Sequence, residues 1–247
     1  MVNLIGKTQR HSVFFIPANV NPPSFPPVDQ ASPEGLLAIG GDLSSERLLA
    51  AYRLGIFPWY SAGQPILWWS PNTRAMLYPN QVKISRSLRK TLKRGEFTVT
   101  HDTCFEDVIR ACAAPRGADN DPGTWITPEM IEAYLALHRL GYAHSVEIWR
   151  HGKLAGGLYG LALGRGFFGE SMFSRYADAS KVALVKLAEY LARLDFRFID
   201  CQMPSPHLAS LGAVPVSRER FMRELASALK QPDQLGPWTE DSGQPRP

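Results

Sequence analysis

The chain has 247 residues, of which 45% are hydrophobic, 20% are charged and 11% are aromatic, and its net charge is +4. This composition excludes a disordered chain, and no hydrophobic run approaches the roughly 18 residues that a membrane-spanning helix needs. The three cysteines lack CxxC spacing and predict neither a disulfide framework nor a zinc site. We therefore expect a cytoplasmic protein of one or two domains that binds no metal.

The N-terminal part predicts a small unit around one short helix. The chain begins with a proline-rich stretch, which favours extended or irregular backbone. Ser44 or Ser45 is suited to cap a helix that Gly55 would end. Three of the six tryptophans follow between Trp59 and Trp69. We interpret residues 1–73 as a small N-terminal α/β domain.

The positive charge is concentrated in a predicted helix over residues 84–94. Lys83 and five basic residues of this helix carry six positive charges, with no acidic residue among them, so the rest of the chain has a net charge of −2. At about 100° per residue the five lie within an arc of about 140°, opposite Ile84, Leu88 and Leu92. The five form what we call the basic face: Arg86, Arg89, Lys90, Lys93 and Arg94.

A helix face of one sign of charge needs a partner. Each pair of like charges at this spacing costs a few tenths of a kcal/mol through repulsion. A phosphate backbone would relieve that repulsion, with release of counterions. We interpret the basic face as a nucleic-acid contact, and the alternatives are a solvated helix face or an acidic protein partner.

The rest of the chain predicts a mixed sheet of α+β class. Alternating strands at 145–150 and 153–163 share a hairpin turn, and a third strand at 167–174 leads to an apolar helix at 179–194. The other predicted elements are strands at 97–101 and 196–203, helices at 105–112, 128–140, 206–211 and 219–230, and a loop at 114–122. We interpret residues 74–247 as a second domain with a loose tail from about residue 231.

Two polar side chains lie at the end of the last predicted strand. The period of two places Asp200 and Gln202 on one face and Cys201 on the other. A carboxylate and an amide there are suited to position a nucleophile and a developing oxyanion. The alternative is a strand end that caps the next turn. With no histidine nearby, we interpret Cys201 as a core residue and not as a thiol nucleophile.

The strand at 167–174 carries a second candidate site. The same period places Glu170, Met172 and Ser174 on one face, where the carboxylate would bind a cation and the flexible apolar side chain would bind a hydrophobic group. A core methionine beside an edge glutamate is the alternative. Four tryptophans are candidates for stacking on bases, although we expect two or more of them in the core: Trp59, Trp68, Trp69 and Trp125.

Seven motifs in series resemble the bacterial leucyl/phenylalanyl-tRNA–protein transferases. They span about residues 33–212 and are Gly40–Leu43, Gly55–Trp59, Trp68–Pro71, Gly123–Thr127, Gly169–Ser174, Ser180–Lys181 and Asp200–Gln202. The resemblance implies transfer of Leu or Phe, less readily Met, from aminoacyl-tRNA to the N-terminal α-amine of proteins that begin with Arg or Lys, which marks them for degradation. It implies a GNAT-like acyltransferase fold for residues 74–247, without a cofactor, and we expect a monomer.

The resemblance also implies roles for single residues. Asp200 resembles the catalytic aspartate, Gln202 the glutamine that works beside it, and Glu170 the acid that binds the basic acceptor N-terminus. The basic face resembles the tRNA-binding cluster of the family. The residues expected around the aminoacyl-adenosine of the donor are Trp59, Trp125, Phe167, Met172, Leu158, Leu187 and Ser174.

Three positions depart from the family pattern. Leu158 and Leu187 stand where members carry Met and Phe, which keeps the pocket apolar and shifts its preference between Leu and Phe. Ser205 stands where members carry Asn, so the role of that asparagine is open here. There are two rival interpretations. An acetyl-CoA acyltransferase would need a glycine-containing loop for the pyrophosphate, and the stretch 174–181 has no glycine. A non-catalytic tRNA-binding module gives no reason for the arrangement of Asp200, Gln202 and Glu170.

The implied reaction needs neither ATP nor a metal, because the donor ester is already activated. It does need a neutral α-amine, whose pKa lies near 8. We hypothesise that Asp200 orients this amine and accepts its proton, while Gln202 holds Asp200 or the ester carbonyl. The leaving ribose oxygen is the alternative proton acceptor.

Overall fold

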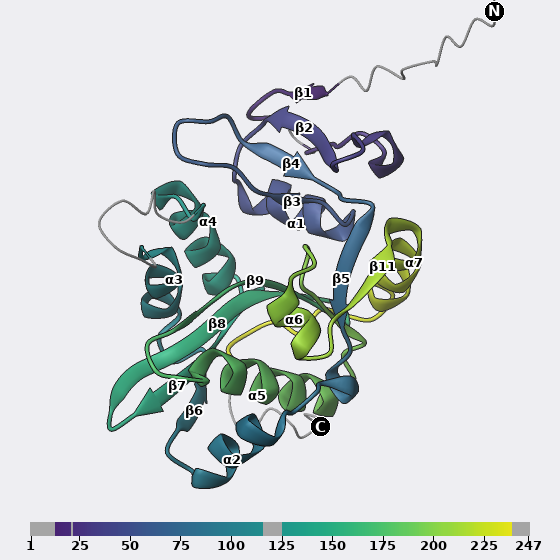
Figure 1. Cartoon of the computed structure of the whole chain (residues 1–247). Helices are drawn as coiled ribbons and strands as arrows, with labels where there is room; N and C mark the ends of the chain where they lie inside the picture. Colours follow the sequence, from purple (N-terminus) through teal and green to yellow (C-terminus); the bar gives the residue numbers. More distant parts are fainter. Residues whose placement is uncertain (1–12, 21, 116–124, 239–247) are drawn as a thin grey trace, which may run out of the picture.

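The computed structural model describes residues 13–20, 22–115 and 125–238, and it arranges them around two β-sheets (Figure 1). Most of the predicted loop at 114–122, the first two residues of the Gly123–Thr127 motif and the chain beyond Trp238 lie outside these ranges. None of the described helices is long and apolar enough to cross a membrane.

The smaller sheet has four strands in the order β1-β2-β4-β3. Its strands are β1 (Phe14–Ile16), β2 (Leu36–Gly40), β3 (Phe57–Pro58) and β4 (Leu67–Trp69), with a 3-10 turn η1 at Val28–Gln30. Helix α1 (Ser45–Arg53) packs beside it. As predicted, the Ser44 side chain caps α1 by accepting from the backbone N of Arg47, and Gly55 follows its end with φ of 71°.

The larger sheet has seven strands in the order β11-β5-β10-β9-β8-β7-β6. Only β9 and β10 are parallel, and the other neighbours are antiparallel, so the predicted mixed α+β sheet is confirmed. The strands are β5 (Thr73–Leu77), β6 (Thr98–His101), β7 (Ala143–Arg150), β8 (Lys153–Leu163), β9 (Gly166–Ser174), β10 (Phe198–Asp200) and β11 (Val214–Ser217).

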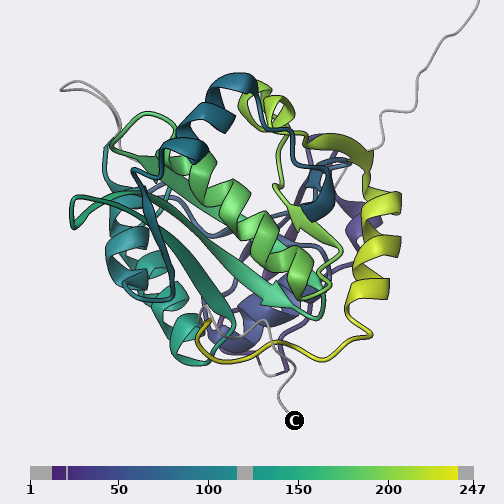
Figure 2. The ribbon, with the colours of Figure 1, turned by 90° about the horizontal axis from the view of Figure 1, so that it is seen from below.

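Helices cover both faces of the larger sheet. One face carries the apolar helix α5, which Figure 2 shows lying along the sheet, and α2 packs beside α5. Residues of α1, α3, α4 and α7 share the buried cluster on the other face. Their bounds are α2 (Arg86–Arg94), α3 (Phe105–Ala113), α4 (Pro128–Arg139), α5 (Ala179–Arg193), α6 (Pro206–Ser210) and α7 (Arg218–Ala228), with a 3-10 turn η2 at Pro79–Gln81.

One buried cluster joins the two sheets. It contains Leu37 and Trp68 of the smaller sheet together with Tyr134 of α4 and Phe168 of β9. The second cluster fills the space between the larger sheet and α5. Because the first cluster is continuous, the two sheets share one core, and the division of the chain near residue 73 stays a prediction.

Helix α2 is amphipathic as predicted. Leu88 is only 2% exposed, and Ile84 and Leu92 pack against the same buried cluster as α5. All five residues of the basic face are exposed. The Ser85 side chain caps the helix, and Gly95 ends it with φ of 66°. The leucines therefore fix α2 to the protein and leave the basic face in solvent.

The prediction of a loose tail from residue 231 is wrong for the residues up to Trp238. Trp238 is only 4% exposed, and Asp233 accepts hydrogen bonds from Arg53 and from the backbone N of Gly164. A buried indole and a paired carboxylate hold this segment, although its proline and glycine content favours irregular backbone. Residues 239–247 lie outside the described ranges.

Candidate active site

The site lies where β9 and β10 separate. The two strands pair only as far as Phe168 and Asp200, and β9 then continues to Ser174 while the other chain turns away. A cavity of about 260 Å³ occupies the gap. Its apolar lining includes four residues that were expected around the donor: Leu158, Phe167, Met172 and Leu187. Its polar lining includes Trp125, Glu170, Ser171, Gln202, Ser205 and His207.

Glu170 is the extra residue of a β-bulge. Tyr159 of β8 pairs with Ser171 and Gly160 pairs with Gly169, so Glu170 has no partner in the ladder. A bulge of this kind shifts the alternation of side chains by one residue. Glu170 therefore points toward the cluster that contains Tyr159, whereas Met172 packs against the cluster beneath α5. The predicted common face for Glu170 and Met172 is wrong for this reason, and both residues reach the cavity only because it passes through the gap between the strands.

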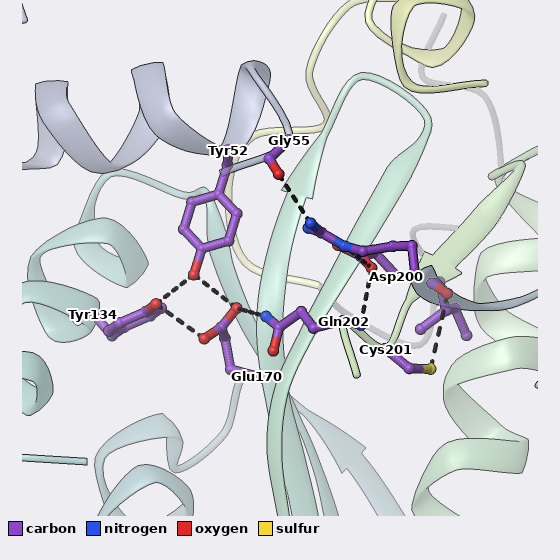
Figure 3. A network of polar contacts seen from close by, with 9 residues as sticks. Tyr52, Gly55, Tyr134, Glu170, Asp200, Cys201 and Gln202 are labelled. Carbon is purple, nitrogen blue, oxygen red and sulfur yellow. Dashed lines mark hydrogen bonds and ion pairs between the residues drawn. The ribbon is translucent and has the colours of Figure 1, made fainter. Parts of the chain in front are cut away.

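The Glu170 carboxylate sits in a cage of donors (Figure 3). It is 8% exposed, and it accepts from the hydroxyl of Tyr52 at 2.7 Å, the hydroxyl of Tyr134 at 3.0 Å and the side-chain amide of Gln202 at 2.7 Å. Burial raises its pKa to about 7, with a further rise from the charge of Asp200, and the bonds from the two tyrosines and Gln202 oppose that rise. Glu170 thus changes charge close to neutral pH.

The two tyrosines remain donors throughout this range. Burial raises the pKa of Tyr52 and of Tyr134 well above 10, and the negative charge of Glu170 raises both further. The two hydroxyl oxygens also lie 2.5 Å apart. Because each hydroxyl carries one proton, the tyrosines can supply two of the three contacts at a time while Glu170 is charged, and a protonated Glu170 supplies the third. Tyr52 belongs to α1 and Tyr134 to α4, so elements of both sheets orient the carboxylate.

Asp200 lies beneath the cavity wall and does not line the cavity. It is 0% exposed, and its two oxygens accept from Nε and Nη2 of Arg74 at 2.9 and 2.7 Å. Arg74 also donates to the carbonyl of Gly55, and its guanidinium stacks over the rings of Phe57 and Phe221. A bidentate guanidinium–carboxylate pair of this kind is strong and fixes both groups. Asp200, the expected catalytic residue, is therefore held in place by Arg74.

Gln202 connects Asp200 with Glu170. Its backbone N donates to Asp200 Oδ1 at 2.9 Å, which holds the backbone of Gln202 at φ of 59°. This left-handed turn ends β10 before the predicted position 203 and points the side chain at Glu170 (Figure 3). Asp200 and Gln202 thus face the same cluster, as expected, and only Gln202 lines the cavity.

Cys201 faces the opposite cluster, as predicted, and it also lines the cavity. Burial raises the pKa of its thiol, with a further rise from the charge of Asp200. A thiol that stays protonated is a weak nucleophile. The interpretation that Cys201 is not a nucleophile is therefore supported, while its description as a pure core residue is too narrow.

The tryptophans divide between surface and core. Trp59 is 42% exposed and lines a second, smaller pocket of about 190 Å³ together with Trp125, Glu170 and Gln202. Trp68 is buried, and the indole of Trp69 donates to the carbonyl of Trp59 at 2.7 Å. The two tryptophans expected near the adenosine therefore line this second pocket together, and Trp125 also lines the main cavity.

Ser174 lies outside the cavity. Its hydroxyl donates to the carbonyl of Tyr176 at 2.7 Å and accepts from the backbone N of Ser180, so it organises the start of α5. It lines an adjoining hollow that shares Met172 and His207 with the cavity.

Helix α2, which carries the basic face, contacts the segment that follows β9. Thr91 of α2 donates to Asp178 at 3.1 Å, and only six residues separate Asp178 from Met172 in the cavity wall. A hollow between them is lined by Lys90, Arg94 and Tyr176. Among the described residues, no group of three His, Cys, Asp or Glu side chains is arranged to hold a metal ion.

The sequence analysis missed three residues of this network, Tyr52, Arg74 and Tyr134, and also Tyr159, whose ring packs against Tyr134 and lines the cavity. A single arginine within the apolar strand that begins at Thr73 was the available signal for a buried carboxylate partner. The tyrosines lie in amphipathic helices and in a strand where an aromatic residue is ordinary, so their sequence context carries no comparable signal.

Comparisons with known proteins agree on one family. Residues 76–226 match the family "Leucyl/phenylalanyl-tRNA protein transferase", and residues 41–72 match its N-terminal domain. The chain is 59% identical over 226 residues to the leucyl/phenylalanyl-tRNA–protein transferase of Aromatoleum aromaticum, covering 91% of this chain and 94% of that one. It is 53% identical over 232 residues to that of Anaeromyxobacter sp., covering 94% and 97%.

Solved structures are much more distant. The structure of L-PGS from Bacillus licheniformis is 10% identical, with a TM-score of 0.43 over 79% of this chain and 71% of that one. This likeness is too low to define the fold, so the expected GNAT-like domain stays a prediction. The two family matches and the high identity of the relatives are decisive: the chain belongs to the leucyl/phenylalanyl-tRNA–protein transferase family of enzymes.

Proposed function

We propose that the protein transfers Leu or Phe, and less readily Met, from aminoacyl-tRNA to the N-terminal α-amine of proteins that begin with Arg or Lys. The transfer marks the acceptor protein for degradation. The observation that carries the proposal is the cavity between β9 and β10, which combines an apolar lining with the Glu170 carboxylate and the Gln202 amide at its polar side.

The apolar lining accounts for the donors. Leu158, Phe167, Met172 and Leu187 present no polar group to a side chain in the cavity. An apolar pocket distinguishes side chains by only about 1–3 kcal/mol per methylene. Leu, Phe and Met therefore share one pocket, and differences in shape set the order among them.

Glu170 accounts for the acceptors. A carboxylate pairs with the guanidinium of Arg or the ammonium of Lys at the first residue of the acceptor. The tyrosine hydroxyls that donate hydrogen bonds to Glu170 fix its orientation before the acceptor protein binds, which reduces the entropy cost of binding. Its pKa of about 7 means that the carboxylate carries its charge most fully above neutral pH.

The chemical step is an aminolysis. The neutral α-amine of the acceptor attacks the ester carbonyl of the donor, the new amide bond forms, and the bond to the ribose oxygen breaks. The amine proton passes to that ribose oxygen, so no further reactant is needed. Gln202 lies at the cavity and is placed to orient the amine or the carbonyl. Asp200 acts through Gln202 as a positioning residue, because Arg74 and the backbone of Gln202 occupy its oxygens.

The tRNA body would bind to the basic face of α2. All five of its side chains are exposed and are free to contact phosphates. Trp59 and Trp125, which line the second pocket beside Glu170 and Gln202, are suited to stack on the terminal adenosine. We further propose a GNAT-like fold for residues 74–247, which the separating parallel pair β9 and β10 supports, and a cytoplasmic monomer.

The test is a transfer assay read by mass spectrometry. The protein is incubated with Leu-tRNA and a peptide that begins with Arg, and the peptide is expected to gain one leucine. The same peptide with an acetylated N-terminus or with Asp in the first position is expected to gain none. Acetyl-CoA in place of the charged tRNA tests the rival acyltransferase. Acetylation of the peptide, or no leucine on the Arg peptide, would refute the proposal.

A further inference from the structure

Residues 231–238 end in a buried tryptophan on the α5 side of the larger sheet. The Trp238 ring stacks on His144 of β7 with a centroid distance of 3.9 Å and an interplanar angle of 6°. It also contacts the rings of Tyr190 and Phe196, at 4.9 and 6.3 Å. Trp238 thus fills a niche that residues from a strand and a helix form.

Polar contacts fix this segment at both of its ends. The backbone N of Trp238 donates to Asp102 Oδ2 at 2.7 Å, and the same oxygen lies 2.8 Å from His144 Nδ1. The carboxylate of Asp233 accepts from Arg53 at 2.6 Å and from the backbone N of Gly164 at 2.7 Å. The indole is therefore held in one position relative to β7 and β9.

The niche adjoins the wall of the active-site cavity. Phe167 of β9 is fully buried, lines the cavity and contacts the Trp238 ring at a centroid distance of 5.8 Å. Phe167 thus separates Trp238 from the space where the donor side chain would lie. A protein core is close-packed, so a ring in contact with this wall limits how far the wall can move.

We propose that Trp238 is a positioning residue that sets the depth of the donor pocket through Phe167. This inference rests on the proposed function, since it names a residue that determines which donor side chain the pocket prefers. Without the indole, Phe167 gains room to turn away from the cavity and the pocket becomes deeper. A deeper pocket favours Phe over Leu as donor, because the smaller side chain then leaves part of the pocket empty.

The test is a competition between Leu-tRNA and Phe-tRNA in one reaction with a single Arg-initiated peptide. The ratio of the two products reports the ratio of kcat/KM values, and it does not depend on how much of the enzyme is folded. Trp238→Ala is expected to lower the Leu-to-Phe ratio about 10-fold, which is the lower end of the range for a change of one methylene. Trp238→Phe, which keeps a smaller ring, is expected to lower it about 2-fold.

Leu235→Ala is the matched control, because Leu235 belongs to the same segment and is exposed. It is expected to leave the ratio unchanged. An unchanged ratio in both Trp238 variants, with or without loss of total activity, would overturn the inference and leave Trp238 a purely structural role. If the unaltered protein transfers neither amino acid, the proposed function itself fails, which is a different result.

Discussion

The buried carboxylate of Glu170 makes the stability of the protein depend on pH. Its pKa is about 7 in the folded protein, mainly because of burial, against an ordinary value of 4.5. Between these values the folded protein holds a proton that the unfolded chain releases, so the free energy of unfolding falls as pH rises. The full difference corresponds to about 3 kcal/mol, present below pH 4.5 and lost above pH 7.

Glu170→Gln removes this titration and keeps the size of the side chain. From pH 5 to pH 8 the free energy of unfolding of the unaltered protein should fall by about 2.5 kcal/mol more than that of the variant. Urea unfolding of both proteins at the two pH values measures it. The comparison across pH cancels any constant cost of the substitution, such as a weaker bond to Tyr52 or Tyr134. A difference between the proteins that stays constant within about 0.5 kcal/mol would refute a carboxylate perturbed by burial.

Two further variants sharpen the test. Glu189→Gln alters a carboxylate that is about half exposed, on α5, and is expected to show no such dependence on pH. Tyr52→Phe removes a bond that lowers the pKa of Glu170, so the loss of stability should continue to a higher pH than in the unaltered protein. A shift toward lower pH would show that Tyr52 does not stabilise the charged form.

Two other predictions concern the anchored carboxylate and the basic face. Arg74→Met leaves Asp200 buried without its partner and should lower the free energy of unfolding by about 3–5 kcal/mol. The double variant Arg74→Met with Asp200→Asn should lower it less than Arg74→Met alone. Urea unfolding of these two variants and the unaltered protein checks both expectations. Changing Arg89, Lys90 and Lys93 to Gln should weaken Leu-tRNA and Phe-tRNA about equally and reduce the salt slope of binding by up to about 3, measured by filter binding over a range of salt; a loss for one tRNA alone would contradict backbone contact.

The elements that could be predicted are those with a strong local pattern. The hairpin of β7 and β8 follows from alternation around His151 and Gly152, and α5 follows from its high content of apolar residues. Helix α2 follows from the spacing of its leucines and basic residues. In each case neighbouring residues decide the structure, so one sequence is sufficient.

The missed features depend on residues far apart in the chain. Arg74 and Asp200 are 126 positions apart, and no local pattern links them. The bulge at Glu170 is a matter of pairing with β8, although Gly169 before it is a residue that often marks such a site. Trp238 is buried only because Asp102, His144 and α5 provide a niche for it. The family roles located Glu170 and Gln202, whereas only the folded chain shows how they are held.

The one-residue insertion at Glu170 places the side chains of Glu170 and Met172 on opposite faces of a single strand. Without it, the acid and Met172 would share a face, and any change in the packing around one would disturb the other. With it, each residue belongs to a different core. Under the proposed function, substitutions on the α5 side would alter the preference for the donor side chain, and substitutions around Tyr52 and Tyr134 would alter the recognition of the acceptor.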